Sequence, residues 1–408
     1  MFNRKHFHYT ETQDLFRLLK PLHGGNFAPQ VYENWYRARH YALNILHVQT
    51  PYDGKLAQDG VHFVLRGASP IMLSVARQIA LIAHYPTFQE ENGKNRTVIT
   101  ILYKKEEIDD IISELSKEEY LCHLPRLCKY TILEGSKEGY LKINKEHEDS
   151  YLDIELELIG FNSSDYDAYS YREKDMVINE EDIPPYQEAF SLIDIRKAKR
   201  VNMVYHVGAD IDNLPADDPN TAERYSKALH YFCYQQSPME TQKKWDELCG
   251  NHRDSAIDQI NLRNMISNVL CADCFETRLK AVINKKEVGI DDDAEITTTE
   301  IDKLIRKKYF YILGQVKSNL AQLAKCEHYR WIAEKLIFGI LPLSEKERFE
   351  DEHKFGDDRK NYRKSLKKKG IHIDLCSYRT LRRINPGDMK YDCFLMMAMP
   401  RILRESLQ

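Results

Sequence analysis

Long apolar runs, an excess of charge of one sign and an ordered cysteine framework are all missing from this 408-residue chain. No uninterrupted apolar stretch approaches the roughly 20 residues that a membrane-spanning helix requires, and the N-terminal sequence has no apolar signal region. The net charge of −4, from 59 basic and 63 acidic residues, does not mark a nucleic-acid or anionic-membrane binder in bulk. We therefore expect a cytoplasmic protein in which any basic patch is local.

The nine cysteines are odd in number and scattered, which favours reduced thiols over a disulfide framework. Cys271 and Cys274 have the C-x-x-C form of a redox or zinc half-site, but no second pair lies at finger spacing. Small buried cysteines on a helix are the favoured interpretation, and no metal site is predicted.

Enzyme signatures are also scarce, because the chain contains no P-loop, no G-x-S-x-G and no H-E-x-x-H. We accordingly predict no catalytic residue. In contrast, 42% hydrophobic and 11% aromatic residues are enough to fill real cores, and the length suits about two or three domains.

Residues 1–58 are predicted to be a helical N-terminal extension. Residues 32–46 have helical apolar periodicity and include Trp35, Tyr36, Arg37 and Arg39. These side chains either contact a ligand or cap the next domain, and capping is the favoured interpretation.

A strand, turn, helix and strand follow one another from residue 62 onward. His62–Gly67 is typical of a buried strand, residues 72–83 of an apolar helix, and the β-branched stretch 96–102 of a second strand. This order predicts a Rossmann-like βαβ unit, within an α/β domain over residues 59–290 that has a parallel sheet and helical additions. The first turn would aim helix N-terminal amides at a phosphate.

The turn resembles that of the Trk-type NAD-binding domain of bacterial potassium-uptake regulators. Where that family has G-x-G-x-x-G, this chain has Gly67-Ala68-Ser69-Pro70-Ile71-Met72, so only the first glycine is kept, and no acidic residue ends the second strand. The resemblance implies NAD or another nucleotide as the cofactor, and the departures leave open a scaffold kept for structure. The candidate nucleotide-binding residues are Gly67, Ala68 and Ser69, with Asp210 from an acidic loop after a strand expected at 201–208.

Signals are weaker between the second strand and residue 300. Residues 108–115 are a helix candidate, and residues 151–160 alternate like a strand with Asp153, Glu155 and Glu157 on one face. These acidic side chains either bind a metal or lie on a strand face that points outward, and the outward face is the favoured interpretation. The chain is mainly helical from 221, including a long helix at 259–279, and the acidic, threonine-rich residues 291–300 are predicted to be a linker.

Residues 320–339 form the densest group of functional side chains. Their apolar spacing predicts an amphipathic helix that ends at Gly339. With His372, Leu375, Tyr378 and Leu381 downstream, this helix resembles the RyR domain, the module repeated in ryanodine receptors and found singly in many bacterial proteins. The shared pattern is a leading Leu-Ala, a His-x-x-Trp core, a glycine at the helix end and His-x-x-Leu-x-x-Tyr-x-x-Leu. The family's aromatic residue after that glycine is Ile340 here, and its His-Pro pair is His372-Ile373.

The resemblance covers about residues 316–408 and implies a small, mainly α RyR domain, placed at 301–408, that senses a nucleotide-type ligand. Helical spacing is expected to flank Trp331 with Glu327, Arg330 and Glu334, and a tryptophan face beside a guanidinium suits stacking of a planar base, with Arg330 or Lys335 on a phosphate. The alternative is structural: Trp331 belongs to the core, and Glu327 and Glu334 brace Arg330 through ion pairs. The candidate ligand-binding residues are His328, Arg330, Trp331, Glu334, Lys335, His372 and Tyr378.

Three functions remain open at this point. The leading hypothesis is a nucleotide-type ligand sensor or binding protein in bacterial antiviral or second-messenger signalling. The second is an NAD-dependent or nucleotide-processing enzyme that uses Ser69 and Asp210, and the third is a purely structural protein. The expected partner is a nucleotide-type small molecule. No membrane or duplex nucleic acid is expected as a partner, and assembly into a homo-oligomer is left open. The basic residues 360–370 suit either polyphosphate or RNA, or a solvated helix face, which is the commoner case.

Overall fold

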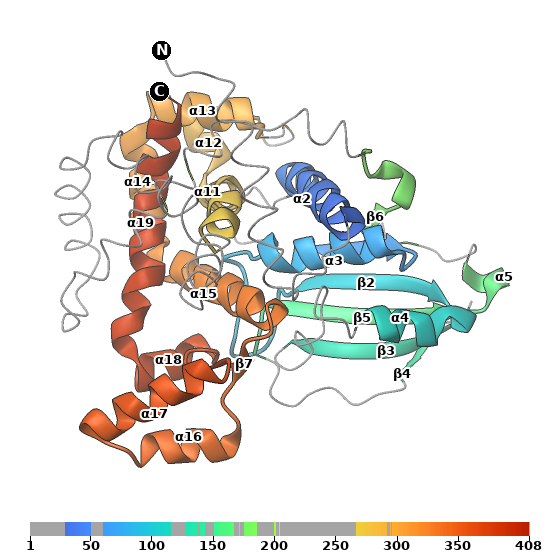
Figure 1. Cartoon of the computed structure of the whole chain (residues 1–408). Helices are drawn as coiled ribbons and strands as arrows, with labels where there is room; N and C mark the ends of the chain where they lie inside the picture. Colours follow the sequence, from blue (N-terminus) through green and yellow to red (C-terminus); the bar gives the residue numbers. More distant parts are fainter. Residues whose placement is uncertain are drawn as a thin grey trace.

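The computed structural model describes residues 29–49, 60–115, 128–136, 139–142, 151–166, 175–185, 267–291 and 296–407, with single residues at 171, 200, 204 and 294. In this part of the chain, one sheet is covered on one face by α2 and α3, and a group of helices lies beyond one end of its strands (Figure 1). Among these residues, no helix is both long and apolar enough to cross a membrane.

The sheet has six strands in the order β4-β3-β5-β2-β1-β6. All neighbours pair in parallel except β3 and β4, which are antiparallel. The five parallel strands with flanking helices give the α/β architecture of Rossmann-like character that the sequence predicts. The strands are β1 (His62–Arg66), β2 (Thr97–Lys104), β3 (Lys129–Ser136), β4 (Gly139–Lys142), β5 (Ile154–Phe161) and β6 (Met176–Ile178).

The predicted βαβ unit is confirmed. β1 and β2 lie side by side in parallel, with Val64 opposite Thr100, and α3 (Pro70–Ile82) is the crossover between them. Proline suits the first turn of α3 because its missing N–H has no intrahelical partner there. Every residue from Ile71 to Ile82 is buried, which fits a helix between the sheet and other helices.

The N-terminal helix α2 (Pro29–Gln49) caps this domain, as the favoured interpretation predicts. Trp35 is buried, and Arg39 forms two hydrogen bonds with the Asp273 carboxylate, at 2.8 and 2.9 Å. Arg37 donates to the carbonyl oxygens of Pro184 and Ile183. These cations are therefore used to hold α2 against the rest of the chain.

The helical part after residue 267 packs against the edge of the sheet where the strands begin. α15 lies at its centre and contacts both α3 and α19. The Cys326 thiol donates to the His84 carbonyl oxygen just after α3, and the Tyr151 hydroxyl, just before β5, donates to Leu375. One buried apolar cluster runs through both parts. The strands point away from α15, so their C-terminal ends lie at the opposite edge of the sheet (Figure 1).

The remaining helices and short elements complete the chain. They are η1 (Lys105–Glu107), α4 (Ile108–Leu115), α5 (Ser163–Tyr166), η3 (Glu180–Asp182), α11 (Phe275–Val282), α12 (Lys285–Val288), α13 (Thr298–Lys307), α14 (Tyr309–Ser318), α15 (Leu320–Ile337), α16 (Glu345–Glu352), α17 (Gly356–Lys368), α18 (Tyr378–Ile384), η4 (Pro386–Asp388) and α19 (Met389–Ser406), with a two-stranded parallel pair of β7 (Leu341–Pro342) and β8 (Ile371–His372).

Two expectations about connections need correction. The predicted linker at 291–300 is shorter, because Ile296 is fully buried and Thr297 caps α13, which begins at Thr298. The predicted long helix at 259–279 falls partly outside the described residues. Its described part is helical from 267, turns at Cys274 and continues as α11. The strand expected at 201–208 also lies outside the described residues.

Candidate functional site

Helix α15 has two polar faces with different surroundings. His328, Trp331 and Lys335 lie on one face, toward β8 and α18, whereas Glu327, Arg330 and Glu334 lie on the other, toward α11. Spacings of three and four residues place side chains on a common face of a helix, which produces this separation. The seven ligand-binding candidates are therefore divided between two environments.

His328, Trp331, His372 and Tyr378 form what we call the aromatic cluster. Trp331 meets His372 edge to face, with ring centroids 5.1 Å apart. His328 lies 5.4 Å from Tyr378 and is nearly parallel to Trp331 at 6.2 Å. The cluster thus joins the middle of α15 to β8 and the start of α18, which are more than 35 residues away in the sequence.

The histidines of the cluster are held neutral. His328 Nε2 donates to the Cys376 carbonyl oxygen at 3.0 Å, and burial lowers the pKa of His328 to about 4. Its Nδ1 lies 3.6 Å from Asp392, a carboxyl whose pKa is raised well above its usual value by burial and by Glu327. A neutral imidazole therefore faces a carboxyl group whose ionisation is disfavoured by burial.

His372 has one ring nitrogen engaged by the backbone. The Asp374 backbone N–H donates to His372 Nδ1 at 3.3 Å, which leaves the proton on Nε2. Burial, followed by the charges of Lys367 and Lys335, lowers the pKa of His372 to about 3. His372 Nε2–H is thus a hydrogen-bond donor at neutral pH, on a side chain that stays 17% exposed.

Lys335 connects the two faces of the helix. Its Nζ lies 5.5 Å from the centroid of the Trp331 ring and 2.6 Å from Glu334 Oε1. The Lys335 ammonium therefore lies over one side of the Trp331 indole and also donates a hydrogen bond to the buried Glu334 carboxylate.

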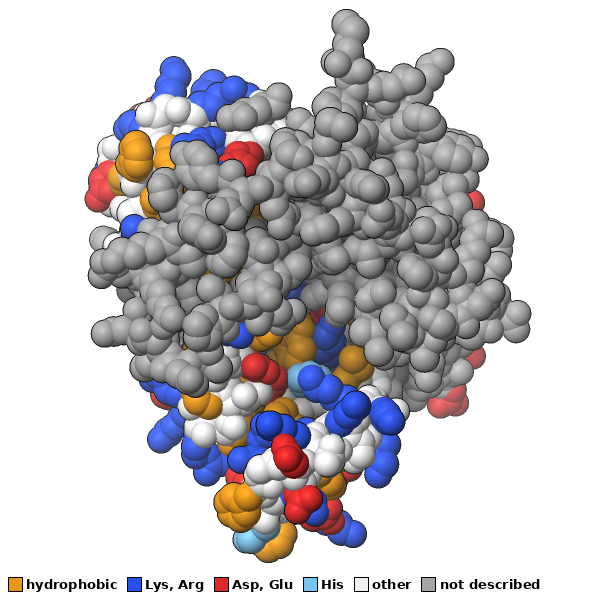
Figure 2. Space-filling view, turned by 60° about the vertical axis from the view of Figure 1, so that its left-hand side comes forward, with side chains coloured by type: hydrophobic (Ala, Val, Ile, Leu, Met, Phe, Trp, Pro, Cys, Tyr) orange, Lys and Arg blue, Asp and Glu red, His pale blue; other side chains and the backbone are white. Residues whose placement is uncertain are grey.

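The space-filling view shows a hollow between the tip formed by α16–α18 and the bulk of the molecule (Figure 2). A histidine lies in it beside hydrophobic side chains, with Lys and Arg side chains gathered around it. Trp331, His372 and Tyr378 keep part of their surface exposed, as a contact with a ligand requires.

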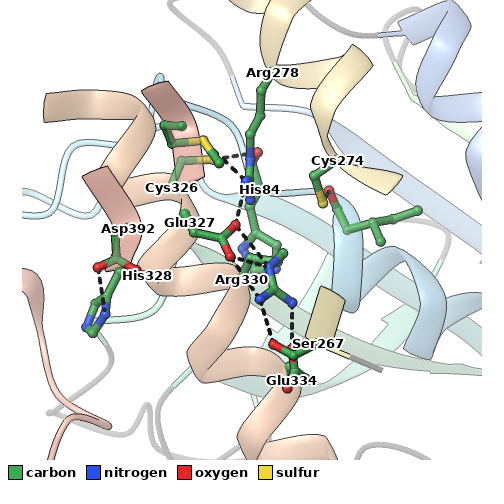
Figure 3. Close-up of polar contacts among 12 residues, drawn as sticks. His84, Ser267, Cys274, Arg278, Cys326, Glu327, His328, Arg330, Glu334 and Asp392 are labelled. Carbon is green, nitrogen blue, oxygen red and sulfur yellow. Dashed lines mark hydrogen bonds and ion pairs between the residues drawn. The ribbon is translucent and has the colours of Figure 1, made fainter. Parts of the chain in front are cut away.

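The opposite face of α15 is a buried ion network (Figure 3). Arg278 of α11 donates to Glu327 at 2.5 Å, and Arg330 is bonded to Glu327, to Glu334 at 2.6 Å and to Ser267. Arg330 is 1% exposed and Glu334 is fully buried. The bracing of Arg330 by Glu327 and Glu334 is confirmed, and neither Arg330 nor Glu334 faces the hollow.

The Rossmann turn keeps part of its expected geometry. Gly67 has φ of +104°, a conformation that side chains rarely adopt, and Ala68 and Ser69 follow it into α3. However, the Ser69 hydroxyl donates to Glu180 at 2.6 Å, so a carboxylate lies where a phosphate would meet the helix N-terminus. Asp210, the fourth nucleotide-binding candidate, lies outside the described residues.

A polar row that the sequence interpretation missed crosses the sheet. His62 lies 2.8 Å from Asp175 through Nδ1 and 2.7 Å from Thr100 Oγ1 through Nε2, and Thr100 donates to Glu157. The Asp–His–Thr order is that of a hydrolytic triad. Thr100 is 0% exposed, so no substrate reaches its hydroxyl, and the row ties neighbouring strands together.

The three acids expected on one strand face are each engaged by a neighbour. Asp153 accepts from His84, Glu155 pairs with Lys129 at 2.5 Å, and Glu157 accepts from Thr100. Within the described ranges, no group of three or more His, Cys, Asp or Glu side chains is arranged to hold a metal.

The C-x-x-C pair is structural. Cys271 and Cys274 are buried free thiols, and burial raises the pKa of Cys274 to about 12. Neither sulfur is a thiolate at neutral pH, which removes the nucleophilic form that redox or metal chemistry needs.

The chain has no match among protein families, curated proteins or solved structures.

Proposed function

We propose that this protein binds and senses a nucleotide-type ligand through the aromatic cluster and Lys335. The observation that carries the proposal is the meeting of His328, Trp331, His372 and Tyr378, the last three partly exposed, with Lys335 over the indole ring. Aromatic rings offer stacking surface to a planar base, and nearby ammonium groups attract phosphate.

The chemistry of the site supports binding more than catalysis. Its histidines are neutral and their pKa values lie far below neutral pH, so neither is matched to proton transfer near pH 7. His372 Nε2–H instead supplies a fixed donor, which suits an acceptor atom on a base. Recognition by stacking and one or two directed hydrogen bonds follows from these groups.

The setting of the proposal comes from the resemblance. Taken as an RyR domain, residues 301–408 would provide the sensing module, and bacterial RyR domains accompany nucleotide-signalling and defence genes. We extend the proposal to antiviral or second-messenger signalling on that basis. The hypothesis of an NAD-dependent enzyme receives less support, because Glu180 sets a negative charge at the turn that would hold the dinucleotide phosphates.

The proposal predicts ligand-dependent thermal stabilisation that requires Trp331. The purified chain is screened with NAD, ATP and cyclic and linear oligonucleotides, because a ligand that binds the folded state stabilises it by mass action. At about 100 times Kd the gain is about 2.7 kcal/mol, a shift of a few degrees in Tm. Trp331→Ala is expected to abolish the shift.

The matched control is Phe355→Ala, which removes an aromatic ring that is 77% exposed on the tip of the molecule. It should leave the ligand shift unchanged. Mass spectrometry of the ligand after incubation separates binding from turnover. A ligand that is consumed contradicts the sensor, and the absence of any shift with the whole panel contradicts nucleotide binding.

A further inference from the structure

The surface of α17 and α18 carries a dense stripe of cations. Between residues 360 and 383, eight Lys or Arg side chains are exposed, and the one acidic residue, Asp374, is buried. We call this set the basic stripe: Lys360, Lys364, Lys367, Lys368, Lys369, Arg379, Arg382 and Arg383. The chain as a whole has a net charge of −4, so this concentration is local.

The basic stripe adjoins the aromatic cluster. β8 and His372 pack against α17, and the charge of Lys367 acts on His372. On α18, the charge of Arg382 acts on Tyr378, the ring that meets His328. The cations are thus continuous with the rim of the hollow, where Figure 2 shows Lys and Arg side chains beside the histidine and hydrophobic side chains.

The stripe is held on a rigid support. Asp351 of α16 accepts hydrogen bonds from Arg359 and Arg363, at 2.7 Å each, and fixes the start of α17. A helix of 13 residues such as α17 is about 20 Å long, so the positive surface extends well beyond the reach of one phosphate group. Cations spaced along a helix beside the aromatic cluster suit a chain of phosphates.

Resting on the proposed function, we propose that the ligand of this site is a short single-stranded oligonucleotide. One unpaired base occupies the aromatic cluster, and the phosphodiester backbone follows the basic stripe along α17 and α18. A duplex is disfavoured because its bases are stacked and paired, whereas stacking on protein aromatic rings uses splayed single strands. The residues assigned to the backbone are Lys364, Lys367 and Arg382, in addition to Lys335 near the base.

The test compares hexanucleotides with mononucleotides. Fluorescence anisotropy measures binding of labelled homo-hexamers of A, C, U and T to the full chain, and the matching monophosphates are added as competitors. For at least one base, the hexamer should bind about tenfold or more tightly than the monophosphate, and its affinity should fall as salt rises, because phosphate contacts release counterions.

Variants locate the two halves of the ligand. Lys364→Glu with Lys367→Glu should weaken hexamer binding about tenfold or more, whereas Lys317→Glu with Lys346→Glu, which changes the charge equally at exposed positions elsewhere, should weaken it less than about threefold. Trp331→Ala should weaken both hexamer and monophosphate. Unchanged Tm values verify that each variant is folded.

Three results would overturn the inference. Equal affinities for hexamer and monophosphate, with Trp331 still required, keep the proposed function but remove the backbone contact. Hexamer binding that Trp331→Ala does not change, or that base-free polyphosphate displaces equally well, shows attraction to a polyanion without base recognition. Binding of neither nucleotide form contradicts the proposed function itself.

Discussion

Two buried carboxyl groups, Glu327 and Asp374, have pKa values shifted in opposite directions. Burial raises the pKa of Glu327, but Arg330 and Arg278 outweigh this effect and lower the pKa to about 2. Asp374, also buried, accepts one hydrogen bond from the Asn385 amide, and burial raises its pKa to about 7. The partner, and not the residue type, decides whether the carboxyl is charged.

Asp374 is therefore expected to make stability depend on pH. Burial and Asp388 raise its pKa from 3.8 to about 7, while Asn385 and Lys367 oppose the shift. A raised carboxyl pKa contributes stability that is present below about pH 4 and is lost as the pH rises to 7. Between pH 4 and 7, the free energy of unfolding of Asp374→Asn should therefore rise relative to that of the wild type. At pH 8 the difference should be on the order of 1 kcal/mol or more.

Urea unfolding at pH 4, 6 and 8 measures this effect. Asp358→Asn, at an exposed position on α17, serves as the control with no change in the pH profile. A constant difference between Asp374→Asn and the wild type over this range would contradict the expected titration.

At the scale of elements, buried ion pairs on the inner face of α15 hold it against α11. Glu327 is the acceptor shared by Arg278 of α11 and Arg330 of α15, and both guanidinium groups are 1% exposed or less. Glu327→Gln leaves two buried cations short of counter-charge. We expect a loss of about 3–5 kcal/mol in the free energy of unfolding.

The comparison for this variant is Glu345→Gln, an exposed carboxylate on α16, which should change stability by about 0.5 kcal/mol or less. Urea titration at pH 7 gives both values. A loss below about 1 kcal/mol for Glu327→Gln would show that the network is dispensable.

The elements found from the sequence are those with a strong local signal. β1, α3 and β2 are apolar and β-branched or periodic, and α15 is long and periodic, so their patterns were sufficient. Strands β3, β4 and β6 were missed, although β3 has eight residues. β6 has three residues and β4 has four, and their pairing comes from longer neighbours in the sheet, which a local pattern does not contain.

At the scale of the whole molecule, the two candidate regions lie at opposite edges of the sheet. The Gly67 turn follows β1 at the C-terminal edge, whereas α15 packs where α3 ends and β5 begins. A nucleotide bound at the aromatic cluster therefore does not touch the Rossmann turn. The sequence interpretation allowed a ligand between or within the two parts, and our proposal places it within the C-terminal part.

Gly67→Asp is expected to separate the two regions in an experiment. A side chain at φ of +104° adds strain of about 1–3 kcal/mol, so the variant should unfold at a lower temperature. Its ligand-induced increase in Tm should equal that of the wild type. An increase that disappears in this variant, as in Trp331→Ala, would mean that the ligand binds at the turn.

The site itself was only half predictable. Helical spacing predicted that Trp331 lies beside Glu327, Arg330 and Glu334, but in the structure it lies with His328 and Lys335 on the other face. Spacing did not show which face turns inward, because His328 and Arg330 are equally polar in a sequence. The orientation of the helix depends on Arg278, which is 49 residues from Glu327 in the sequence. Arg278 donates to Glu327, and this ion pair turns the Arg330 face inward. The position of Lys367 near His372 could not be predicted from the sequence either, since α17 and β8 meet only in the folded chain.

The order of strands in the sheet has a consequence for the sequence of events during synthesis. β1 and β2 are neighbours, so they can pair as soon as both have left the ribosome. β3 and β4 emerge next, yet β3 pairs with β5, and β5 alone joins it to β2. The β3–β4 hairpin therefore waits with an unpaired edge until residues 154–161 arrive, and this interval is when the nascent chain most needs protection from aggregation.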